Sequence, residues 1–560
     1  MSAVWLKQYQ KGVPAEINPD QFDSIPQLLS ESFQKYSSRP AFVNFGKKIT
    51  YADLDQMASQ FAAYLQKDLG LKKGDRIALM MPNILQYPIC LFGALRAGLV
   101  VVNVNPLYTA RELQYQLKDA GAETIVIFAN AGHILQACLS ETPVKNIITT
   151  QIGDMLGFPK GALINFVLKK VKKMVPDYSL PTAIDFKSIL HTRKASEFTP
   201  VKMVNSDLAF LQYTGGTTGV SKGAMLSHRN MIANLLQAKA WLSPLLDKTP
   251  NEQEVIITAL PLYHIFSLTA NCFTFSYVGG LNVLITNPKD IPGFVKELKK
   301  WRFSAFTAVN TLFKALLNHP DFANLDFSKL KVSLGGGMAV QKSTAEMWKL
   351  KTGKPLIEAY GLTETSPAAC INPMDLPQFN GCIGLPISST EVRIKNDNEK
   401  DLAFGENGEI CIKGPQVMVG YWNKPEETAK VMTADGFFKT GDIGFMDENG
   451  FVKIMDRKKD MILVSGFNVY PNEVEDVVSG HPKILEVAAV GIPHEHSGEA
   501  VKLFIVKKDN SLTEQEVIDY CRQNMVAYKV PKAVEFRDSL PKSNVGKILR
   551  KELRVDTKSA

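Results

Sequence analysis

The sequence predicts an α/β protein with a large N-terminal domain of layered α/β subdomains and a small α+β C-terminal domain. Three observations support this. Helical segments alternate with short Val- and Ile-rich runs through the first half, short alternating strands follow Ser389, and segments of both kinds fill the last part of the chain. The chain also has 560 residues, more than one hydrophobic core usually accommodates, so at least two domains are expected.

The first half repeats the order of helix and strand. Residues 57–70, "MASQFAAYLQKDLG", carry the apolar period of a helix, and residues 76–82, "RIALMMP", have the composition of a strand. Residues 110–128, "ARELQYQLKDAGAETIVIF", contain the same order within one stretch. This repetition is typical of a layered, mostly parallel sheet covered by helices.

The second half divides into two further portions. Residues 390–396, 408–414 and 450–457 ("TEVRIKN", "GEICIKG" and "GFVKIMDR") are short alternating strands joined by Gly, Asn and Asp turns. They predict a small β-barrel-like portion at about 389–455, which completes an N-terminal domain spanning residues 1–455. A hinge is expected at 456–461, followed by a compact α+β domain at 462–560.

The composition is that of a globular protein, with 45% hydrophobic and 21% charged residues and no low-complexity tract. The net charge of +8 is modest for this length, so we expect no nucleic-acid partner. The seven cysteines lack CxxC spacing and are expected to be reduced, mostly buried and not metal ligands. The first residues do not have the basic and apolar regions of a signal peptide, which favours a cytoplasmic location.

The stretch from Thr258 to Thr286 contains no Asp, Glu, Lys or Arg and is long enough to cross a bilayer. Six polar or helix-breaking residues interrupt it, and polar groups in an apolar run usually mark a protein interior. We therefore favour a buried helix and strand beside a ligand site over a membrane span. The interrupting residues are Pro261, His264, Asn271, Gly279, Gly280 and Asn282.

Residues 160–175, "KGALINFVLKKVKKMV", predict an amphipathic helix in which only Phe166 is misplaced. One interpretation is a surface helix whose apolar arc packs on the core. The other is an interfacial helix that contacts an anionic membrane surface on the inner face of the cell membrane, because no acidic residue interrupts its basic face. The apolar arc holds Leu163, Ile164, Val167, Leu168, Val171, Met174 and Val175, and the opposite face holds Asn165, Lys169, Lys170, Lys172 and Lys173.

The stretch from Tyr213 to Asn230, "YTGGTTGVSKGAMLSHRN", has the glycines, small hydroxyls and lysine that a phosphate-binding loop needs. It is not a Walker A motif, which requires Gly-Lys-Ser/Thr, since Lys222 follows Ser221 and precedes Gly223. An ordinary loop between two elements is the alternative for this composition.

Six further motifs follow that loop in order: "PLYHIF" (261–266), "SLGGGMAV" (333–340), "EAYGLTET" (358–365), "FFKTGDIG" (437–444), "DRKKDMILVSGFNVYPNEVE" (456–475) and "LPKSNVGKILR" (540–550). This ordered set resembles the adenylate-forming superfamily, most closely the bacterial long-chain fatty-acid–CoA ligases, and covers nearly the whole chain. The resemblance implies a mobile C-terminal domain, with ATP, CoA and Mg²⁺ as reactants. It also implies two steps: a fatty acid becomes acyl-AMP with release of pyrophosphate, and CoA then displaces AMP. Many relatives have Pro where Ser221 stands, a mild departure.

The resemblance also implies nucleotide-binding residues. Glu364 would bind magnesium, because a hard oxygen ligand suits a hard cation. Thr363 would contact the α-phosphate and Tyr360 would stack on adenine, while Asp442 and Arg457 would bind the ribose. The phosphate-binding residues would be Thr214, Gly215, Gly216, Thr217, Thr218, Gly219 and Lys222, and the other nucleotide-binding residues Gly335, Gly336, Gly337, Glu358 and Gly361.

Three further roles come from the resemblance. Lys547 would stabilise charge as the carboxylate attacks the α-phosphate, although a lone lysine near a C-terminus is ordinarily a solvated surface residue. Rotation at Lys459 would withdraw Lys547 and bring the loop around Gly466 to the CoA thiol. His264 would orient the substrate carboxylate, with a satisfied core histidine as the alternative.

The residues after His264 and the stretch 305–318, "AFTAVNTLFKALLN", resemble the wall of an acyl pocket with no fixed cation, which suits an aliphatic chain. Alternatives within the superfamily are an aryl or medium-chain acid–CoA ligase and an acyl-AMP synthetase that feeds a carrier protein. A non-catalytic fatty-acid or nucleotide binder and a light-producing oxygenase are alternatives of other classes. A homodimer also stays an open alternative.

Overall fold

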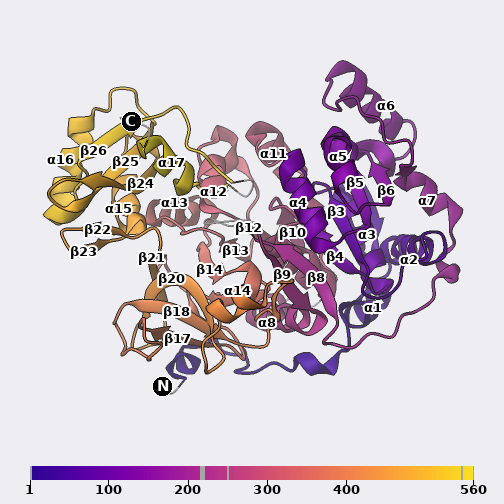
Figure 1. Ribbon diagram of the computed structural model, residues 1–560, viewed down its shortest axis with the longest axis horizontal. Coiled ribbons are helices and arrows are strands. Elements are labelled where there is room, and N and C mark those ends of the chain that lie inside the picture. The colour runs from indigo at the N-terminus through magenta and orange to yellow at the C-terminus, as the bar shows by residue number, and fades with distance from the viewer. Residues whose placement is uncertain (1–2, 215–220, 249–250, 544–545, 559–560) are drawn as a thin grey trace.

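The protein was analysed as a computed structural model that describes residues 3–214, 221–248, 251–543 and 546–558. The predicted phosphate-loop residues Gly215, Gly216, Thr217, Thr218 and Gly219 lie outside these ranges. Figure 1 shows the last part of the chain, in yellow, as a lobe of its own beside a larger body, in agreement with the predicted fold class.

Two large sheets form the larger body. Their central strands run parallel, and antiparallel strands lie at their edges. The first sheet has the order β16 (Leu385–Pro386), β15 (Ala368–Ile371), β14 (Ile357–Gly361), β13 (Val332–Gly335), β12 (Ala305–Ala308), β10 (Val255–Thr258), β11 (Leu281–Leu284), β1 (Pro40–Asn44), β2 (Lys47–Thr50). The second has the order β19 (Gly420–Tyr421), β9 (Gly223–Ser227), β8 (Leu208–Tyr213), β4 (Val100–Asn103), β3 (Arg76–Met80), β5 (Thr124–Phe128), β6 (Asn146–Thr150), β7 (Ile184–Asp185).

Helices cover both faces of these sheets and make a five-layer arrangement. The largest hydrophobic cluster lies between the two sheets and includes side chains of α1 (Ile25–Lys35), α2 (Tyr51–Lys67), α3 (Gln86–Arg96) and α8 (His228–Leu246). A second cluster joins the first sheet to α11 (Ile291–Leu298), α12 (Asn310–Leu317) and α13 (Lys342–Thr352). A third joins the second sheet to α4 (Ala110–Ala120) and α5 (Gly132–Cys138). Six of the seven cysteines are buried, as expected, and all seven are free thiols.

Local sequence explains why α4 and β5 form where they do. The hydroxyl of Thr109 accepts a hydrogen bond from the amide of Glu112, and the Glu112 carboxylate accepts one from the amide of Thr109, which makes a capping box. Gly121 ends the helix with a φ of 61°, a left-handed conformation that glycine adopts without strain. The strand "TIVIF" follows with every residue buried, as in a central parallel strand. Helix and strand are confirmed here.

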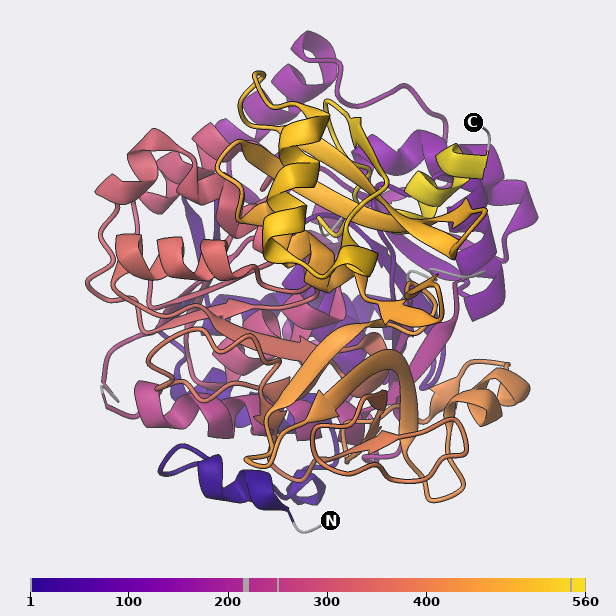
Figure 2. The ribbon, with the colours of Figure 1, turned by 90° about the vertical axis from the view of Figure 1, so that its left-hand side faces the viewer.

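The expected barrel-like portion is a strongly curved antiparallel sheet (Figure 2). The strands follow the order β17 (Glu391–Lys395), β18 (Gly408–Lys413), β20 (Phe438–Met446), β21 (Val452–Arg457), and the first and last strands do not pair to close a barrel. Helix α14 (Pro425–Val431) lies beside this sheet. The C-terminal lobe contains β23 (Phe467–Val469), β22 (Ile462–Val464), β25 (Gly498–Lys507), β24 (Ile484–His494) and β26 (Ala533–Phe536), with α15 (Pro471–Ser479), α16 (Glu514–Asn524) and α17 (Arg550–Lys558). The predicted hinge at 456–461 covers the last two residues of β21 and the turn that leads to β22.

The uncharged stretch 258–286 lies inside the protein. It forms α9 (Ile265–Ser267), the π-helix η8 (Leu268–Phe273) and α10 (Thr274–Tyr277), and it ends beyond β11. Most of its side chains are buried, including polar Asn271 and Asn282. Within the described ranges, no helix is both long enough and apolar enough to cross a bilayer. The interpretation as buried structure is therefore confirmed.

The predicted helix at 160–175 differs from the expectation in two ways. It is shorter, because α6 (Lys160–Phe166) continues only as the π-helix η6 (Val167–Val171). It also packs through a different face: Gly161 lies against Gly153, and Asn165 donates to Asp154 and accepts from the amide of Gly153. Asn165, predicted on the outward face, thus points inward. Because this polar and small-residue side is the packed one, the apolar arc is left partly exposed.

The remaining short elements are α7 (Phe186–Thr192), η1 (Val4–Gln8), η2 (Pro19–Gln21), η3 (Ala129–Ala131), η4 (Leu139–Glu141), η5 (Ile152–Met155), η7 (Ala195–Glu197), η9 (Pro320–Asn324), η10 (Thr363–Thr365) and η11 (Ala527–Lys529). They connect the larger elements. Among them, η10 carries the predicted site residues Thr363 and Glu364, and only Leu362 separates it from the end of β14.

Candidate active site

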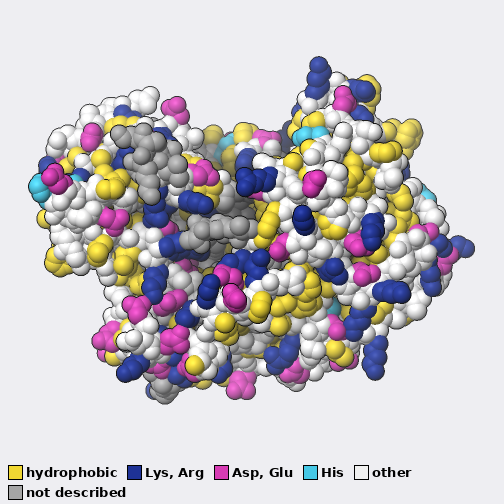
Figure 3. Space-filling model, in the orientation of Figure 1, with side chains coloured by type: hydrophobic (Ala, Val, Ile, Leu, Met, Phe, Trp, Pro, Cys, Tyr) yellow, Lys and Arg dark blue, Asp and Glu magenta, His cyan; other side chains and the backbone are white. Residues whose placement is uncertain are grey.

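A cavity of about 2420 Å³ lies where the two large sheets, the curved sheet and the C-terminal lobe meet. Figure 3 shows the hollow between the lobe and the larger body, with Lys and Arg side chains at its rim. Most of the predicted site residues line it, although they come from distant parts of the chain. They are Thr214, Lys222, His264, Gly336, Gly337, Glu358, Tyr360, Gly361, Thr363, Glu364, Asp442, Arg457, Lys459 and Lys547.

Among the predicted site residues that the structure describes, two do not line the cavity. Gly335 is buried in β13, where an added Cβ would lie 2.6 Å from Cγ2 of Val340, so it serves packing behind the wall rather than the wall itself. This corrects the expectation for the first glycine of the run. Gly466 lies in the turn between β22 and β23, with a φ of 83° and no heavy atom within 4 Å of a Cβ placed there.

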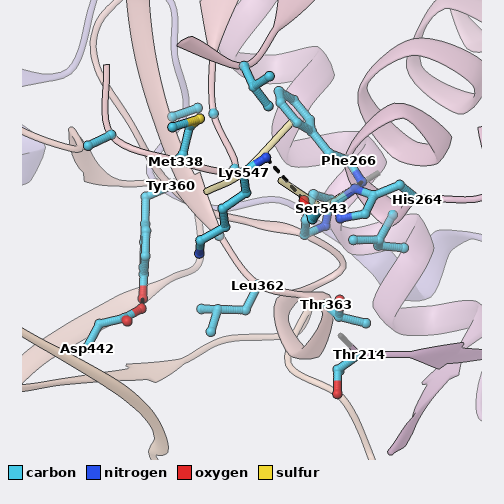
Figure 4. Close-up of a pocket in the computed structure, with 18 of the residues that line it drawn as sticks. Thr214, His264, Phe266, Met338, Tyr360, Leu362, Thr363, Asp442, Ser543 and Lys547 are labelled. Carbon is cyan, nitrogen blue, oxygen red and sulfur yellow. Dashed lines mark hydrogen bonds between the residues drawn. The ribbon is translucent and has the colours of Figure 1, made fainter. Parts of the chain in front are cut away.

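Asp442 and Arg457 are brought together by strand pairing. They are opposite one another in the antiparallel pair β20–β21, and Asp442 Oδ1 lies 3.3 Å from Arg457 Nε. The Tyr360 hydroxyl donates to Asp442 Oδ2 at 2.6 Å (Figure 4). Asp442 is only 2% exposed, yet its Oδ1 accepts no hydrogen bond within the described residues. A buried carboxylate oxygen without a donor fits a hydroxyl supplied by a ligand, as the ribose of a nucleotide would supply.

His264 lies at the start of α9 and accepts a hydrogen bond on Nδ1 from the amide of Phe266 at 3.3 Å. Burial, together with the positive charge of Lys547, lowers the pKa of His264 to about 4. The imidazole is therefore neutral at physiological pH. Because Nδ1 is the acceptor, the proton is assigned to Nε2, which makes that nitrogen a hydrogen-bond donor.

Lys547 is carried into the cavity by a short loop at the end of the C-terminal lobe. Its amide donates to Ser543 Oγ, and its carbonyl accepts from the amide of Ser543. The preceding Gly546 has a φ of 84°, and its carbonyl accepts from the Thr311 hydroxyl of α12 at 3.1 Å. A Cβ on Gly546 would lie 2.8 Å from Thr311 Oγ1, so glycine permits this close approach.

The Lys547 side chain extends between Tyr360 and Leu362 (Figure 4). Enclosure in the cavity, with the positive charge of Arg457 nearby, lowers the pKa of Lys547 to about 8. Lys459 stands at the rim close to the predicted hinge, and partial burial of its ammonium group with Arg457 nearby likewise lowers its pKa to about 8. Both groups are cationic at neutral pH, and a bound polyanion would favour that form further.

Glu364 is the buried carboxylate of η10, next to Thr363. Its Oε1 accepts a hydrogen bond from the Tyr421 hydroxyl at 2.7 Å, and burial raises its pKa. No group of three or more His, Cys, Asp or Glu side chains in the described ranges could hold a metal ion alone. One carboxylate still fits Mg²⁺, because that ion keeps several waters and takes substrate phosphate oxygens as its other ligands.

Lys222 lines the cavity and forms an ion pair with Glu427 of α14, while its ammonium group lies 4.9 Å from the ring centre of Tyr421. Lys430 pairs with the same carboxylate, and the two lysines lower the pKa of Glu427 to about 2. Lys222 is thus paired with an acidic side chain that a phosphate would have to replace. Nothing in the sequence singled out Glu427 or Tyr421, since both come from a stretch without a motif.

An apolar branch of the cavity runs between α8 and the first sheet. Its walls include Trp241 and Leu242 of α8, Ile256 of β10, Val332 of β13 and Ile371 of β15. Residues 305–318 contribute as predicted, but the expectation that they offer no cation is wrong, because Lys314 also lines the cavity. Lys314 stands on the side of the C-terminal lobe, near Glu486, and burial lowers its pKa.

Two family models match this chain. The model described as AMP-binding enzyme matches residues 29–422, and the model described as AMP-binding enzyme C-terminal domain matches residues 473–547. The chain belongs to the AMP-binding enzyme family. The motifs of the sequence therefore lie on the fold that they predicted. Residues of both matched segments line the cavity.

Similar proteins agree with this family. A long-chain-fatty-acid–CoA ligase of Escherichia coli O157:H7 is 56% identical over 558 residues, which is 100% of this chain and 99% of that protein. A protein of the same name from Bacillus subtilis is 39% identical and covers 98% of this chain and 97% of its own. The crystal structure of ATP-bound MatB from Rhodopseudomonas palustris has a TM-score of 0.80 at 29% identity, with 96% of this chain and 99% of that chain covered.

Glu358 gives a prediction for stability. Burial raises its pKa to about 8, and its Oε1 accepts from the amide of Val340 at 3.0 Å. A raised pKa means that the folded protein loses stability as the pH rises from about 4.5 to about 8, because the unfolded chain releases the proton first. We expect Glu358→Gln to raise the melting temperature relative to the original protein at pH 9 but not at pH 5.

Thermal melts of both proteins between pH 5 and pH 9 measure this difference. Glu346→Gln on the exposed face of α13 is the control and should leave the difference constant. Parallel curves for Glu358→Gln would show that this carboxyl group does not titrate in this range.

Proposed function

We propose that the protein is a long-chain fatty-acid–CoA ligase of the AMP-forming type. It converts a fatty acid to acyl-AMP with release of pyrophosphate, and it then transfers the acyl group to CoA with release of AMP. The observation that carries the proposal is one cavity that joins the polar groups of Asp442, His264 and Lys547 to an apolar branch beneath α8. The name of the Escherichia coli relative supports the same substrate class.

In the first step a carboxylate oxygen of the fatty acid attacks the α-phosphorus of ATP. An O–P bond forms, the bond from the α-phosphorus to the oxygen that bridges to the β-phosphate breaks, and pyrophosphate leaves with that electron pair. Lys547 stabilises the negative charge that grows on the α-phosphate, and the Nε2 proton of neutral His264 orients the carboxylate. Thr363 contacts the same phosphate.

The polyphosphate and ribose have their own partners in this proposal. Thr214, residues 215–219 and Lys222 hold the β- and γ-phosphates, while Asp442 and Arg457 hold the ribose and Tyr360 stacks on adenine. Glu364 is the protein ligand of Mg²⁺, whose contribution is to neutralise charge on the phosphates. The Asp442 Oδ1 atom, which accepts no hydrogen bond within the described residues, and the buried carboxylate of Glu364 support these roles.

In the second step the CoA thiol loses its proton to solvent and the thiolate sulfur attacks the acyl carbon. A C–S bond forms, the bond from that carbon to the phosphate oxygen breaks, and AMP leaves with that electron pair. Lys547 lines the cavity in the present arrangement, so this arrangement suits the first step. Rotation at Lys459 would withdraw the loop and bring the turn at Gly466 toward the cavity, so that one site serves both steps.

An aliphatic substrate fits the apolar branch, because the side chains of Trp241, Ile256 and Ile371 are apolar apart from the indole NH, which donates to the carbonyl of Asn372. We propose a long chain over a medium chain or an aryl acid. The proposed small-molecule partners are fatty acid, ATP and CoA, and a homodimer is carried forward as a prediction. The proposed location is the cytoplasm, with peripheral contact at the membrane.

The segment 158–175 supports this membrane contact. Five of its apolar side chains, Phe158, Leu163, Phe166, Val171 and Met174, are between 53% and 89% exposed, since Gly161 and Asn165 take the inward positions. Lys160 and the lysines at 169, 170, 172 and 173 flank them, and no acidic residue occurs in the segment. Figure 1 shows α6 at an outer tip of the larger body. Exposed apolar groups with lysines and no acids suit an anionic bilayer surface.

The substrate proposal is tested by pyrophosphate and AMP release from the purified protein with magnesium-ATP and CoA. Straight-chain acids from acetate to oleate and the aryl acid coumarate are compared. We expect the highest kcat/KM at long chains, because each additional buried methylene adds about 0.8 kcal/mol of binding. A maximum at coumarate would reject the substrate class, and no turnover would reject catalysis.

Lys547→Ala is expected to lower acyl-AMP formation by about 10²-fold or more, because the charge at the α-phosphate loses its stabilising cation. Thioester formation from supplied acyl-AMP and CoA should stay largely intact. Pyrophosphate exchange measures the first step and direct thioester assay the second, with Lys532→Ala as a surface control. An equal loss in both steps would contradict the assigned role.

Changing Lys169, Lys170, Lys172 and Lys173 to Gln is expected to weaken binding to vesicles that contain anionic lipid by at least about tenfold, because each lysine near such a surface contributes about 1 kcal/mol. Vesicle co-sedimentation measures this. The matched control changes four exposed lysines on and after α13, Lys342, Lys349, Lys351 and Lys354, which lie beside exposed Met347 and Leu350. Unchanged sedimentation of the first variant would leave the segment as an ordinary surface helix.

A further inference from the structure

Arg550 stands at the centre of a buried ion cluster beside the hinge. Its Nε and Nη2 donate to the two carboxylate oxygens of Glu475 at 2.9 and 2.7 Å, its Nη1 donates to Asp456 Oδ1 at 3.0 Å, and its Nη2 donates to Asn472 Oδ1 at 2.6 Å. The side chain of Asp456 is 1% exposed, and those of Arg550 and Glu475 are 13% and 14% exposed. Asp460 Oδ2, at 3.7 Å from Nη1, is a third carboxylate partner of this guanidinium. An enclosed guanidinium depends strongly on each of its charged partners.

The carboxylates of Asp456 and Glu475 belong to different parts of the molecule. Asp456 lies on β21, whose pairing with β20 fixes it to the larger body. Glu475 lies on α15, which packs on β24 in the C-terminal lobe. The proposed pivot, Lys459, stands between them in the sequence. The bond from Arg550 to Asp456 therefore crosses the hinge, whereas the bonds from Arg550 to Glu475 stay within the lobe.

Arg550 is also the anchor of the loop that carries Lys547. The loop doubles back on itself, because Lys542 pairs with Ile548 and the amide of Leu549 donates to the carbonyl of Pro541. Arg550 follows at once as the first residue of α17. Only three positions separate the guanidinium that binds Asp456 from the ammonium group in the cavity.

On the larger body, Asp456 is adjacent in sequence to Arg457, which faces Asp442. Asp456 thus ties the anchor of the Lys547 loop to the strand that carries the proposed ribose site. The same carboxylate accepts the amide of Asn472, a second bond across the hinge, and Arg554 of α17 donates to the carbonyl of Lys459 itself.

We propose that Arg550 is a positioning residue, and that its bond across the hinge to Asp456 holds Lys547 in the cavity during the first step of the reaction. The inference rests on the two-step reaction proposed above. Rotation at Lys459 separates Arg550 from Asp456 but not from Glu475. The bond to Asp456 therefore stabilises the arrangement for acyl-AMP formation alone, and the bond to Glu475 stabilises both arrangements equally.

Asp456→Asn and Glu475→Gln make a matched pair, since each removes one negative charge from the same guanidinium and keeps the shape of the side chain. We expect Asp456→Asn to lower the rate of pyrophosphate exchange at least about tenfold and to leave thioester formation from supplied acyl-AMP and CoA within about twofold of the original rate. Glu475→Gln should change both rates by the same factor. Thermal melts of each variant show whether it is folded.

A second pair of variants keeps the inference testable if one protein does not fold. Arg550→Lys retains the positive charge, whereas Arg550→Gln removes it. We expect a higher rate of pyrophosphate exchange for Arg550→Lys than for Arg550→Gln. Adding Asp456→Asn to Arg550→Gln should cause little further loss of exchange, because the bond is already absent.

Two outcomes would overturn the inference: equal loss of both rates in Asp456→Asn, or a loss confined to the first step in Glu475→Gln. Assays of the original protein distinguish a failure of this inference from a failure of the proposed function. If that protein catalyses neither pyrophosphate exchange nor thioester formation, the proposed function fails. If it catalyses both and the variants show no difference between steps, only the role of Arg550 fails.

Discussion

The seating of the Lys547 loop against the larger body is the contact on which the arrangement of the site depends. The loop touches α12 through Gly546 and Thr311, and its end is held by Arg550 at the hinge. These contacts bound the cavity on the side of the C-terminal lobe. Low polarity strengthens electrostatic interactions, so burial there affects enclosed ionisable groups such as His264 and Lys547.

The pKa values of the cavity show this effect with one physical cause. Burial lowers the pKa of His264 to about 4 and that of Lys547 to about 8, and it raises that of Glu358 to about 8. In each case the charged form is the one disfavoured. A ligand that brings negative charge next to Lys547 and Lys459 would favour the charged form of both lysines. His264 and Glu358 would stay neutral hydrogen-bonding groups. The cavity thus combines polar groups that are neutral with cations that need an anionic partner.

In the proposed function, the apolar branch and the segment 158–175 address different parts of one problem, which is the low solubility of a long hydrocarbon chain in water. Burial beneath α8 removes the chain from water during the reaction, and the branch is walled by side chains that already form a continuous hydrophobic cluster. In the segment 158–175 the apolar side chains face outward instead, because the small residue Gly161 and the polar residue Asn165 face inward. Helical periodicity alone does not distinguish these two orientations, because either face can be the packed one.

Much of this protein is determined by local sequence. Capping residues and apolar period predict α4 and β5, alternation predicts the curved sheet, and polar interruptions exclude a membrane span at 258–286, because hydrogen bonding and burial act on neighbouring residues in the same way in any fold. The motifs also identify residues that line one cavity. Tertiary structure alone decides that Gly335 lies behind the wall and that Lys314 lies on it. Only the fold unites Asp456, Glu475 and Arg550 in one cluster, since residues up to 94 positions apart meet there. A pattern along the chain does not encode which distant charges share a buried space, and that is decided by packing.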